Sequence, residues 1–475
     1  MSIGIAAWPR RGTGAADVGQ LRVLHAIHDF LPRHRAGSEI YVAELASAQS
    51  ARHDVWVLAA EYDPSVPHGT LRWRKYQDIP VVELINTWAF RSFHETYESP
   101  RINQQIAHVL HAIRPDIVHV HNLLNLSFDL PRLARERGAR VVATLHDYTL
   151  VCAAGGQRVH ASEAHLCETI DPERCARCFS ESPFGSQLAV GRTLGRGPLL
   201  EIAARLRQRL PSPVAALALD AVRPTVSADD LRRRLAASWQ VFDALDAIVA
   251  PSRSMAREYA GLGANAARVE VSGYGSTVVL QPRRTQSSRP ITIGFVGTLV
   301  WHKGAHVLLE AARRLRGAFT ISIHGDPAVS PGYFENLERR AAGLPVTFAG
   351  PFDRDGLPRV YEAIDLLVVP SLWPENAPFV IQEALAYRVP VAGSAVGGIP
   401  EFIEPDATGV LFERGSAASL ADAIQPLIDD PEILLRLGSN VRAVKSIADD
   451  AAEWDERYAR VLAASAPTNP ATCLR

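Results

Sequence analysis

Long apolar segments are absent from this sequence. No run approaches the roughly 18 uncharged apolar residues that a membrane-spanning helix requires. The first residues, where Arg10 and Arg11 follow a mixed stretch, also lack the apolar core of a secretory signal. These absences argue against a membrane span, and we expect residues 1–20 to be a frayed or disordered leader of a cytoplasmic protein.

A surplus of either charge is missing, and cysteine is scarce. The 50 lysines and arginines nearly balance the 51 aspartates and glutamates, whereas nucleic-acid-binding domains are usually basic. Five cysteines in 475 residues are too few for a secreted disulfide scaffold, which favours a reducing compartment. We therefore expect no nucleic-acid partner.

The remaining composition, 47% hydrophobic and 21% charged, is that of a globular protein long enough for two domains. Near-continuous apolar runs of strand length alternate with helical patterns, which predicts parallel sheets covered on both faces. The alternation occurs twice, in two doubly wound α/β halves. The expected strands are 21–27, 54–60, 117–121 and 140–145 in the first half, and 291–296, 319–324, 364–369 and 389–393 in the second.

A polar segment with prolines near both ends separates the two halves. We predict an N-terminal domain at 21–278, a linker at 279–290, a C-terminal domain at 291–448 and a last helix at 449–464. The segment 179–240 does not fit the alternation and is expected to be a helical insertion. Its part 192–210 carries arginines among leucines, which is compatible with peripheral contact to a membrane surface, although such patterns more often form a solvated helix face.

Two carboxylates, Glu375 and Glu383, stand eight residues apart across an expected helix start. Asn376 is a suitable N-cap and Pro378 a suitable first-turn residue. Glu383 would then lie about two turns inside the helix, roughly 12 Å along its axis. A carboxylate at each end could accept hydrogen bonds from sugar and ribose hydroxyls, while the amides of the helix start face a diphosphate between them.

This segment continues through Pro390 and Val391 to the glycine loop Gly397-Gly398-Ile399-Pro400-Glu401. Together with Glu375 and Glu383-Ala384, it resembles the donor signature of retaining glycosyltransferases of family 4. The resemblance covers about 21–464. It implies the GT-B fold, in which two Rossmann-like domains face each other across a cleft, with the donor held mainly by the second domain and the acceptor mainly by the first. It also implies that the last helix crosses back onto the first domain.

The resemblance assigns donor-binding roles to further positions. Lys303, in the loop that begins at Gly297, is expected to bind the diphosphate, but the arginine that usually accompanies it is Thr298 here. In the first domain Gly37 occupies the second position of a glycine pair whose first member is Ala36. The donor site is expected to comprise Gly37, Gly297, Thr298, Lys303, Glu375, Asn376, Ala377, Phe379, Val380 and Glu383.

His146 ends the strand 140–145, at the edge of a parallel sheet where ligands gather. By resemblance it contacts the transferred sugar, so His146, Lys303 and Glu375 are the expected catalytic residues. His119 and His121 end another strand and are given only supporting or acceptor-side roles. We see no carboxylate placed as a nucleophile and no DxD-type metal motif. The family's front-face reaction without a catalytic metal is therefore expected.

Four of the five cysteines, Cys152, Cys167, Cys175 and Cys178, follow His146 within one segment and end in a Cys-x-x-Cys. Four thiolates can close a tetrahedral structural zinc site. Unligated thiols, an iron–sulfur cluster and disulfides are the alternatives. A zinc ion would shape the acceptor side of the cleft and take no part in the chemistry.

These features predict a retaining transferase that moves a sugar from a nucleotide-sugar donor to a saccharide or lipid-linked saccharide acceptor in polysaccharide or glycolipid biosynthesis. One alternative is a degenerate sugar-nucleotide-binding protein, suggested by Thr298 and Ala36. Another is a GT-B epimerase or phosphorylase. A zinc-ribbon nucleic-acid binder is disfavoured because no basic and aromatic surface accompanies the cysteines.

Overall fold

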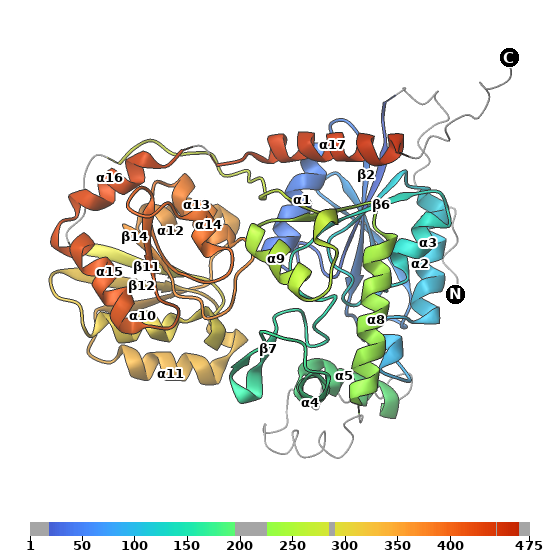
Figure 1. The fold of residues 1–475 in the computed structure, drawn as a ribbon, viewed down its shortest axis with the longest axis horizontal. Helices are drawn as coiled ribbons and strands as arrows, with labels where there is room; N and C mark the ends of the chain where they lie inside the picture. Colours follow the sequence, from blue (N-terminus) through green and yellow to red (C-terminus); the bar gives the residue numbers. More distant parts are fainter. Residues whose placement is uncertain (1–18, 195–225, 285–289, 443, 465–475) are drawn as a thin grey trace.

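The computed structural model describes residues 19–194, 226–284, 290–442 and 444–464. Two parallel sheets form the centres of two lobes, drawn blue to green and yellow to red in Figure 1. The predicted fold class is confirmed. The expected membrane-surface segment 192–210 lies largely outside the described residues, as does most of the expected leader. None of the helices that the structure describes is both long and apolar enough to cross a membrane.

The N-terminal sheet has eight strands in the order β10-β9-β6-β5-β1-β2-β4-β3, all parallel except β3, which pairs antiparallel with β4. Along β1, alternate side chains enter different cores, with Leu24 on one face and Val23 on the other. Both faces are therefore buried, as expected for a parallel sheet. The strands are β1 (Arg22–Ile27), β2 (Asp54–Glu61), β3 (Leu71–Tyr76), β4 (Ile79–Ile85), β5 (Ile117–Val120), β6 (Arg140–Thr144), β9 (Ala247–Ala250) and β10 (Val269–Val271).

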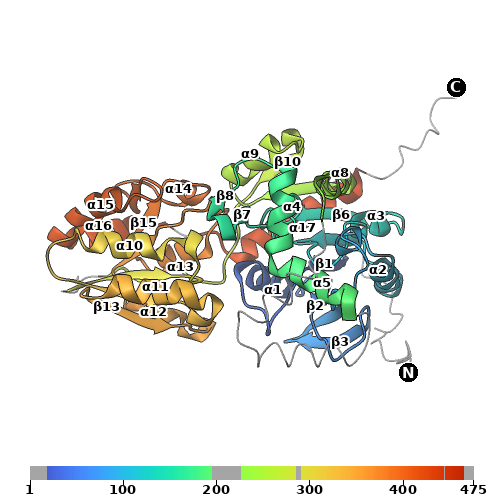
Figure 2. The same ribbon diagram turned by 90° about the horizontal axis from the view of Figure 1, so that it is seen from below.

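Helices cover this sheet on both sides (Figure 1). One core includes side chains from α2, α8 and α9, and the other includes side chains from α1 and from α17 at the end of the chain. A small hairpin and two further helices follow β6, and the hairpin lies at the boundary of the lobes (Figure 2). These elements are α1 (Gly37–Gln49), α2 (Pro100–Ile113), α3 (Leu130–Arg135), β7 (Val159–His160), β8 (His165–Leu166), α4 (Pro172–Glu181), α5 (Pro183–Leu194), α8 (Ala228–Ala244) and α9 (Arg253–Gly261).

The C-terminal sheet has six parallel strands in the order β13-β12-β11-β14-β15-β16. It too is buried on both faces, because Leu366 and Leu367, neighbours on β14, belong to different cores. The strands are β11 (Ile291–Val296), β12 (Phe319–His324), β13 (Val346–Gly350), β14 (Leu366–Val369), β15 (Val391–Ser394) and β16 (Gly409–Phe412). The helices are α10 (Ala305–Ala312), α11 (Pro331–Ala341), α12 (Leu357–Glu362), α13 (Phe379–Ala386), α14 (Ile399–Phe402), α15 (Ala417–Asp429) and α16 (Glu432–Asn440).

The chain passes between the lobes twice. The first passage follows β10, and the second follows α16 and leads into α17 (Ile447–Ala463), which lies along the N-terminal lobe (Figure 1). The two passages are joined by backbone hydrogen bonds, from Ser276 N to Lys445 O at 3.0 Å and from Ile447 N to Ser276 O at 3.0 Å. The connection between the lobes is therefore a pair of bonded segments.

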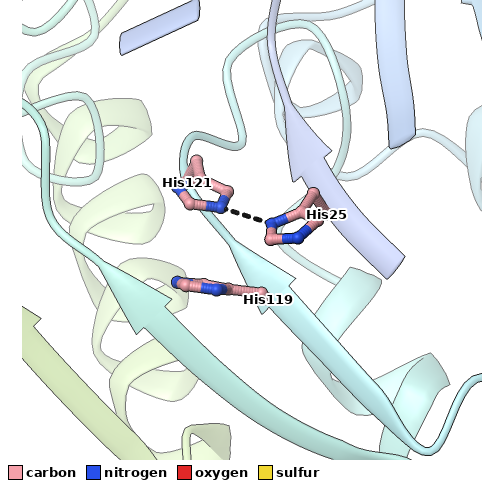
Figure 3. Close-up of side chains that lie close together, drawn as sticks. All are labelled: His25, His119 and His121. Carbon is pink, nitrogen blue, oxygen red and sulfur yellow. Dashed lines mark hydrogen bonds between the residues drawn. The ribbon is translucent and has the colours of Figure 1, made fainter. Parts of the chain in front are cut away.

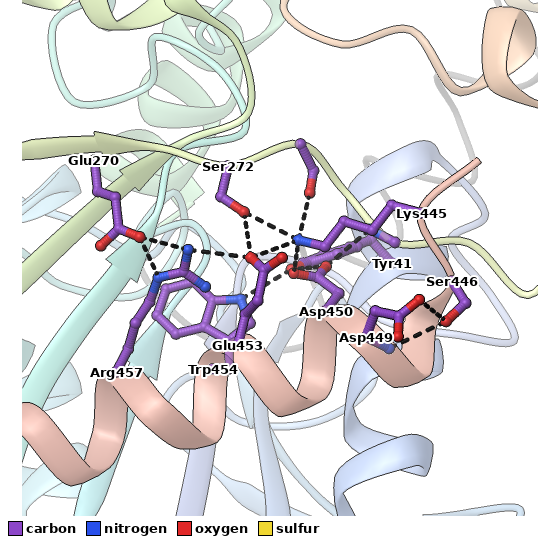
Figure 4. Close-up of polar contacts among 12 residues, drawn as sticks. Tyr41, Glu270, Ser272, Lys445, Ser446, Asp449, Asp450, Glu453, Trp454 and Arg457 are labelled. Atoms are coloured by element: carbon purple, nitrogen blue, oxygen red, sulfur yellow. Dashed lines mark hydrogen bonds and ion pairs between the residues drawn. The ribbon is translucent and has the colours of Figure 1, made fainter. Parts of the chain in front are cut away.

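A polar network fixes α17 in place (Figure 4). Asp450, 2% exposed, accepts hydrogen bonds from the hydroxyl of Tyr41 at 2.9 Å and from the backbone N–H of Gly275 at 2.9 Å. Its other oxygen accepts from Lys445 Nζ at 2.7 Å. Trp454, which is fully buried, donates to the Tyr41 hydroxyl at 3.2 Å. One carboxylate thus ties together helix α1, the first passage and the second passage.

Candidate active site

A cleft of about 1300 Å³ lies between the two lobes. The carboxyl ends of several parallel strands open onto it, where open α/β sheets usually bind ligands. All the donor-site residues expected from the sequence line this cleft, together with His146. The expected residues are thus brought together, although they come from both halves of the chain.

Lys303 and Glu375 meet at the centre of the C-terminal wall. Lys303 ends a short 3₁₀ helix, Trp301–Lys303, after β11, and its Nζ donates to Glu375 Oε1 at 2.5 Å. The same oxygen accepts a hydrogen bond from Ser371 Oγ at 3.0 Å. Lys303 Nζ also lies 5.4 Å from the ring centroid of Trp373. The ammonium is therefore held in the cleft, 29% exposed and positioned for an anionic ligand.

The helix after Glu375 begins later than expected. The prediction that Asn376 caps it is wrong, because α13 starts at Phe379 and Pro378 is its N-cap residue. The Asn376 amide instead donates across the cleft to the carbonyl oxygen of His146 at 2.6 Å. Glu383 consequently lies only about one turn inside the helix, roughly 6 Å along its axis. The first-turn residues Phe379 and Val380 still line the cleft, and the first backbone N–H groups of a helix lack partners within it.

Glu383 is held by two partners that the sequence analysis missed. Its Oε2 accepts from the hydroxyl of Tyr361 at 2.9 Å, and its Oε1 lies 3.3 Å from Arg354 Nη1. Burial raises the pKa of Glu383, and the Arg354 charge opposes that shift. Arg354 also bonds Glu44 on α1 of the other lobe. The sequence position of Arg354 could have indicated a place in the site, because this residue follows strand β13 at the edge of the sheet that faces the cleft.

Gly37, at the start of α1, faces Phe379 across the cleft. A Cβ built on Gly37 would lie 2.8 Å from Phe379 Cδ2, so any side chain at this position would displace the Phe379 ring. The Phe379 ring stacks on Tyr274 with centroids 5.0 Å apart and planes 6° apart. Gly297 and Thr298 lie opposite, at the end of β11, with Thr298 exposed. The Thr298 side chain is neutral and does not supply the positive charge that an arginine would.

His146 is enclosed by hydrogen bonds. Its Nδ1 lies 2.7 Å from the hydroxyl of Tyr274, and its Nε2 lies 3.0 Å from Nδ1 of His121. Burial lowers the pKa of His146 to about 3. The ring is therefore neutral at physiological pH and reaches the cleft as a neutral hydrogen-bonding group.

The four clustered cysteines are free thiols. Cys152 follows β6, Cys167 follows β8, and Cys175 and Cys178 lie on α4. Burial and the neighbouring thiols raise the pKa of Cys175 to about 11 and that of Cys178 to about 12. Among the described residues, two sets of three side chains lie close enough to share a metal ion, and both are elsewhere: His25, His119 and His121, and His28, Asp29 and Glu39. The four described thiols therefore lie in one region, but no three of them are close enough to one another to share a metal ion.

The two facing parallel sheets and the cleft between them define the GT-B class of glycosyltransferase folds. Sucrose-phosphate synthase from Thermosynechococcus elongatus superposes with a TM-score of 0.64 and 18% identity over 94% of this chain and all of that chain. The Anabaena protein HepE, in complex with UDP and glucose, superposes with a TM-score of 0.58 and 16% identity over the same shares.

The sequence itself carries two glycosyltransferase domains. Residues 35–174 match the model of Glycosyltransferase Family 4, and residues 281–444 match that of Glycosyl transferases group 1. The resemblance found in the sequence is confirmed. The chain is 32% identical over 177 residues to a D-inositol 3-phosphate glycosyltransferase of Corynebacterium aurimucosum, and 30% identical over 164 residues to an alpha-D-kanosaminyltransferase of Streptomyces kanamyceticus. Each match spans 34% of this chain and 42% of the relative.

Proposed function

We propose that this protein is a retaining glycosyltransferase that moves a sugar from a nucleotide-sugar donor to a hydroxyl acceptor in polysaccharide or glycolipid biosynthesis. The observation that carries the proposal is the arrangement of Lys303, Glu375 and Glu383 on one wall of the cleft opposite His146. A lysine beside one carboxylate, with a second carboxylate on the same wall, suits a nucleoside diphosphate sugar, because the lysine charge can bind the diphosphate and the carboxylates can accept from hydroxyls.

In this mechanism Lys303 and the first-turn amides of α13 stabilise the charge that develops on the departing diphosphate. Lys303 exchanges its contact with Glu375 for the phosphate oxygens, which frees the carboxylate to accept hydrogen bonds from the donor sugar. Glu383 holds the ribose. The acceptor hydroxyl attacks the face from which the diphosphate leaves and gives its proton to the leaving phosphate, so the anomeric configuration is retained. Catalysis is then mainly positioning and charge stabilisation.

The neighbouring structures suggest which donors to test first. HepE was crystallised with UDP and glucose, and starch synthase IV from Arabidopsis thaliana with ADP and acarbose. The name of the D-inositol 3-phosphate glycosyltransferase relative adds a small hydroxylated acceptor to the saccharide and lipid-linked saccharide acceptors that we propose to test. A cytoplasmic site of action is part of the proposal, since all four described cysteines are free.

The first experiment is a thermal-shift titration with UDP, GDP and ADP and their common sugar conjugates. A ligand that binds the native state raises the unfolding temperature by mass action. We expect nucleotides of one base to raise the unfolding temperature of wild type and of Lys75→Ala, a control at an exposed position on β3. The same nucleotides should not raise the unfolding temperature of Lys303→Ala. The active donor is then incubated with candidate acceptors, and NMR identifies the anomer formed. Binding without turnover would support the degenerate alternative, and an inverted product would overturn retention.

We also propose that Cys152, Cys167, Cys175 and Cys178 bind structural zinc. A buried cation supports this site. Arg234, 5% exposed, donates to the carbonyl oxygens of Thr149 at 2.6 Å and Leu150 at 3.0 Å, close to Cys152. Burial lowers its pKa to about 10, and Cys152 is the largest opposing influence. Zinc with four thiolates carries a net charge of about −2 and would balance this guanidinium.

Metal analysis of protein purified without chelator tests the zinc site. We expect one zinc per chain in wild type and in Cys473→Ser, which changes the one cysteine of the sequence that the proposal does not use. The variants Cys175→Ser and Cys178→Ser should lose the metal and unfold more readily. Stoichiometric iron, disulfides detected by mass spectrometry, or metal-free protein whose stability ignores chelator would contradict the proposal.

A further inference from the structure

Three histidines form a buried cluster at the ends of β1 and β5 (Figure 3). His25 and His119 are 0% exposed and His121 is 4% exposed. They lie close enough to share a metal ion. However, each of their six ring nitrogens already has a hydrogen-bonding partner, which favours a hydrogen-bonded network over a metal centre.

The network runs from helix α1 to the cleft. Gln49 Oε1 lies 2.9 Å from His25 Nε2, and His25 Nδ1 lies 2.9 Å from His121 Nε2. His121 Nδ1 lies 3.0 Å from His146 Nε2, and His146 Nδ1 lies 2.7 Å from the Tyr274 hydroxyl. The last two residues line the cleft. A continuous chain of hydrogen bonds therefore connects a buried amide to the candidate active site.

Each histidine in this chain carries a single ring proton. Burial lowers the pKa of His25 to about 4, lowers that of His146 to about 3, and places that of His121 well below its ordinary value. A neutral imidazole donates through one nitrogen and accepts through the other. The position of one proton in such a chain therefore determines the positions of all the others.

The side-chain amide oxygen of Gln49 sets the direction in which the hydrogen bonds of this chain run. An amide oxygen only accepts, so His25 must carry its proton on Nε2 and accept on Nδ1. His121 then carries its proton on Nε2, and so does His146. The outcome is an unprotonated Nδ1 on His146 that accepts from the Tyr274 hydroxyl.

The contacts of the Gln49 side-chain nitrogen are consistent with this direction of the hydrogen bonds. Gln49 Nε2 donates to the hydroxyl of Tyr458 on α17 at 3.3 Å. The Tyr458 oxygen lies 2.8 Å from His119 Nδ1, and His119 Nε2 lies 2.8 Å from Thr144 Oγ1. If Tyr458 donates to Nδ1, His119 also carries its proton on Nε2. One side chain thus organises both branches of the network.

We propose that Gln49 is a positioning residue that fixes the tautomer of His146, with the proton on Nε2 and an accepting Nδ1 toward Tyr274. The inference rests on the proposed function and deepens it, because Tyr274, which lines the cleft, then donates its hydrogen to His146 and leaves its oxygen to accept from a hydroxyl of the bound donor sugar. It also means that His146 transfers no proton in the reaction.

The test uses full-length protein labelled with ¹⁵N-histidine and needs no substrate. Two-bond ¹H–¹⁵N correlation spectra at pH 7 distinguish the two tautomers, and the signal missing in His146→Gln identifies His146. We expect a protonated Nε2 in wild type and in Gln49→Glu, whose carboxylate can only accept. In Gln49→Leu the His25 Nε2–H loses its acceptor, so the chain should reverse and move the His146 proton to Nδ1.

The opposite tautomer in wild type overturns the proposal, as does a change of tautomer in Gln49→Glu. An unchanged signal in folded Gln49→Leu also overturns it. If Gln49→Leu does not fold, the Gln49→Glu comparison still decides, because a reversed native chain would be redirected by the carboxylate. For an active donor, Gln49→Leu should lower kcat/KM about tenfold without changing the affinity for the nucleoside diphosphate. If wild type has no transferase activity, the proposed function fails while the spectra still test the network.

Discussion

Two glycines support the loop that carries Glu375. Gly397 has a φ of +59°, and Gly398 donates its backbone N–H to Glu375 O at 2.6 Å. A Cβ on Gly397 would lie 2.5 Å from Glu375 O, and one on Gly398 would collide with the carbonyl of Asn376. The obstructing atoms are backbone, which cannot rotate away. The glycine loop therefore supports the backbone at Glu375 and Asn376, and neither glycine is among the residues that line the cleft.

We predict that Gly398→Ala abolishes the nucleotide-induced thermal shift by displacing Asn376 and Glu375. The expected loss of stability is about 1–3 kcal/mol, as for other overpacked sites. Gly332→Ala is the matched control, because no atom lies within 4 Å of its added Cβ and the residue is helical. That control should keep the shift and gain about 0.4–1 kcal/mol. Urea unfolding with and without nucleotide measures both quantities. Normal nucleotide binding by Gly398→Ala would show that the loop tolerates the change.

The sequence analysis identified those site residues whose location in the fold can be predicted from their neighbours in the chain. Lys303 and Glu375 follow apolar strands at loop-to-helix junctions, so their location in the cleft could be predicted. Tyr274 and Tyr361 could not be found this way, because they reach the site only through the packing of distant segments. Asn376 was misread because its side chain donates across the cleft to the His146 carbonyl, a contact between distant segments that local helix-capping propensity does not predict.

At the scale of elements, the predicted strands at 291–296 and 319–324 coincide with β11 and β12. Others were missed. The pair β3 and β4 forms an antiparallel edge, and β3 is only partly buried and rich in charge, so it lacks the apolar run of a central strand. The edge strands β10, β13 and β16 are likewise short or half-exposed. The apolar pattern of the sequence thus predicted the central strands of the sheets better than the edge strands.

Helix α17 depends on Asp450, and this gives a prediction at the same scale. Asp450→Asn removes the charge that pairs with Lys445 and leaves a single accepting oxygen for the three donors Lys445, Tyr41 and Gly275. We expect a loss of about 3 kcal/mol or more, since a buried pair is broken. Asp449→Asn changes an exposed neighbour bonded to Ser446 and should cost about 1 kcal/mol or less. Urea unfolding compares the two variants, and equal losses would show that the network contributes little to stability.

At the scale of the whole molecule, buried neutral histidines make stability depend on pH. Burial lowers the pKa of eight described histidines: His25, His68, His119, His121, His146, His302, His306 and His324. In the unfolded chain these side chains take up protons below about pH 6.5. Their contribution is therefore complete above pH 6.5 and is lost as the pH falls toward their folded values.

We predict that the free energy of unfolding falls steeply between pH 6.5 and 5, by about 1.4 kcal/mol per pH unit for each fully buried histidine. His68→Gln, which removes a histidine with a pKa of about 4, should reduce the slope by about that amount. His111→Gln, at an exposed position, should leave it unchanged. Urea unfolding at pH 7.5, 6.5, 5.5 and 5.0 measures the slope. A flat profile over this range would contradict the neutral state of the buried rings.

The paired passages between the lobes have a mechanical consequence. The two segments are hydrogen-bonded to each other at Ser276, Lys445 and Ile447, so neither passage can shift without affecting the other. Any change in the relative position of the lobes must therefore displace both passages together. On the cleft side, the hydrogen bond from Asn376 to the His146 carbonyl and the contact of Phe379 with Gly37 join the same two lobes, so the walls of the cleft are held together at both of its margins.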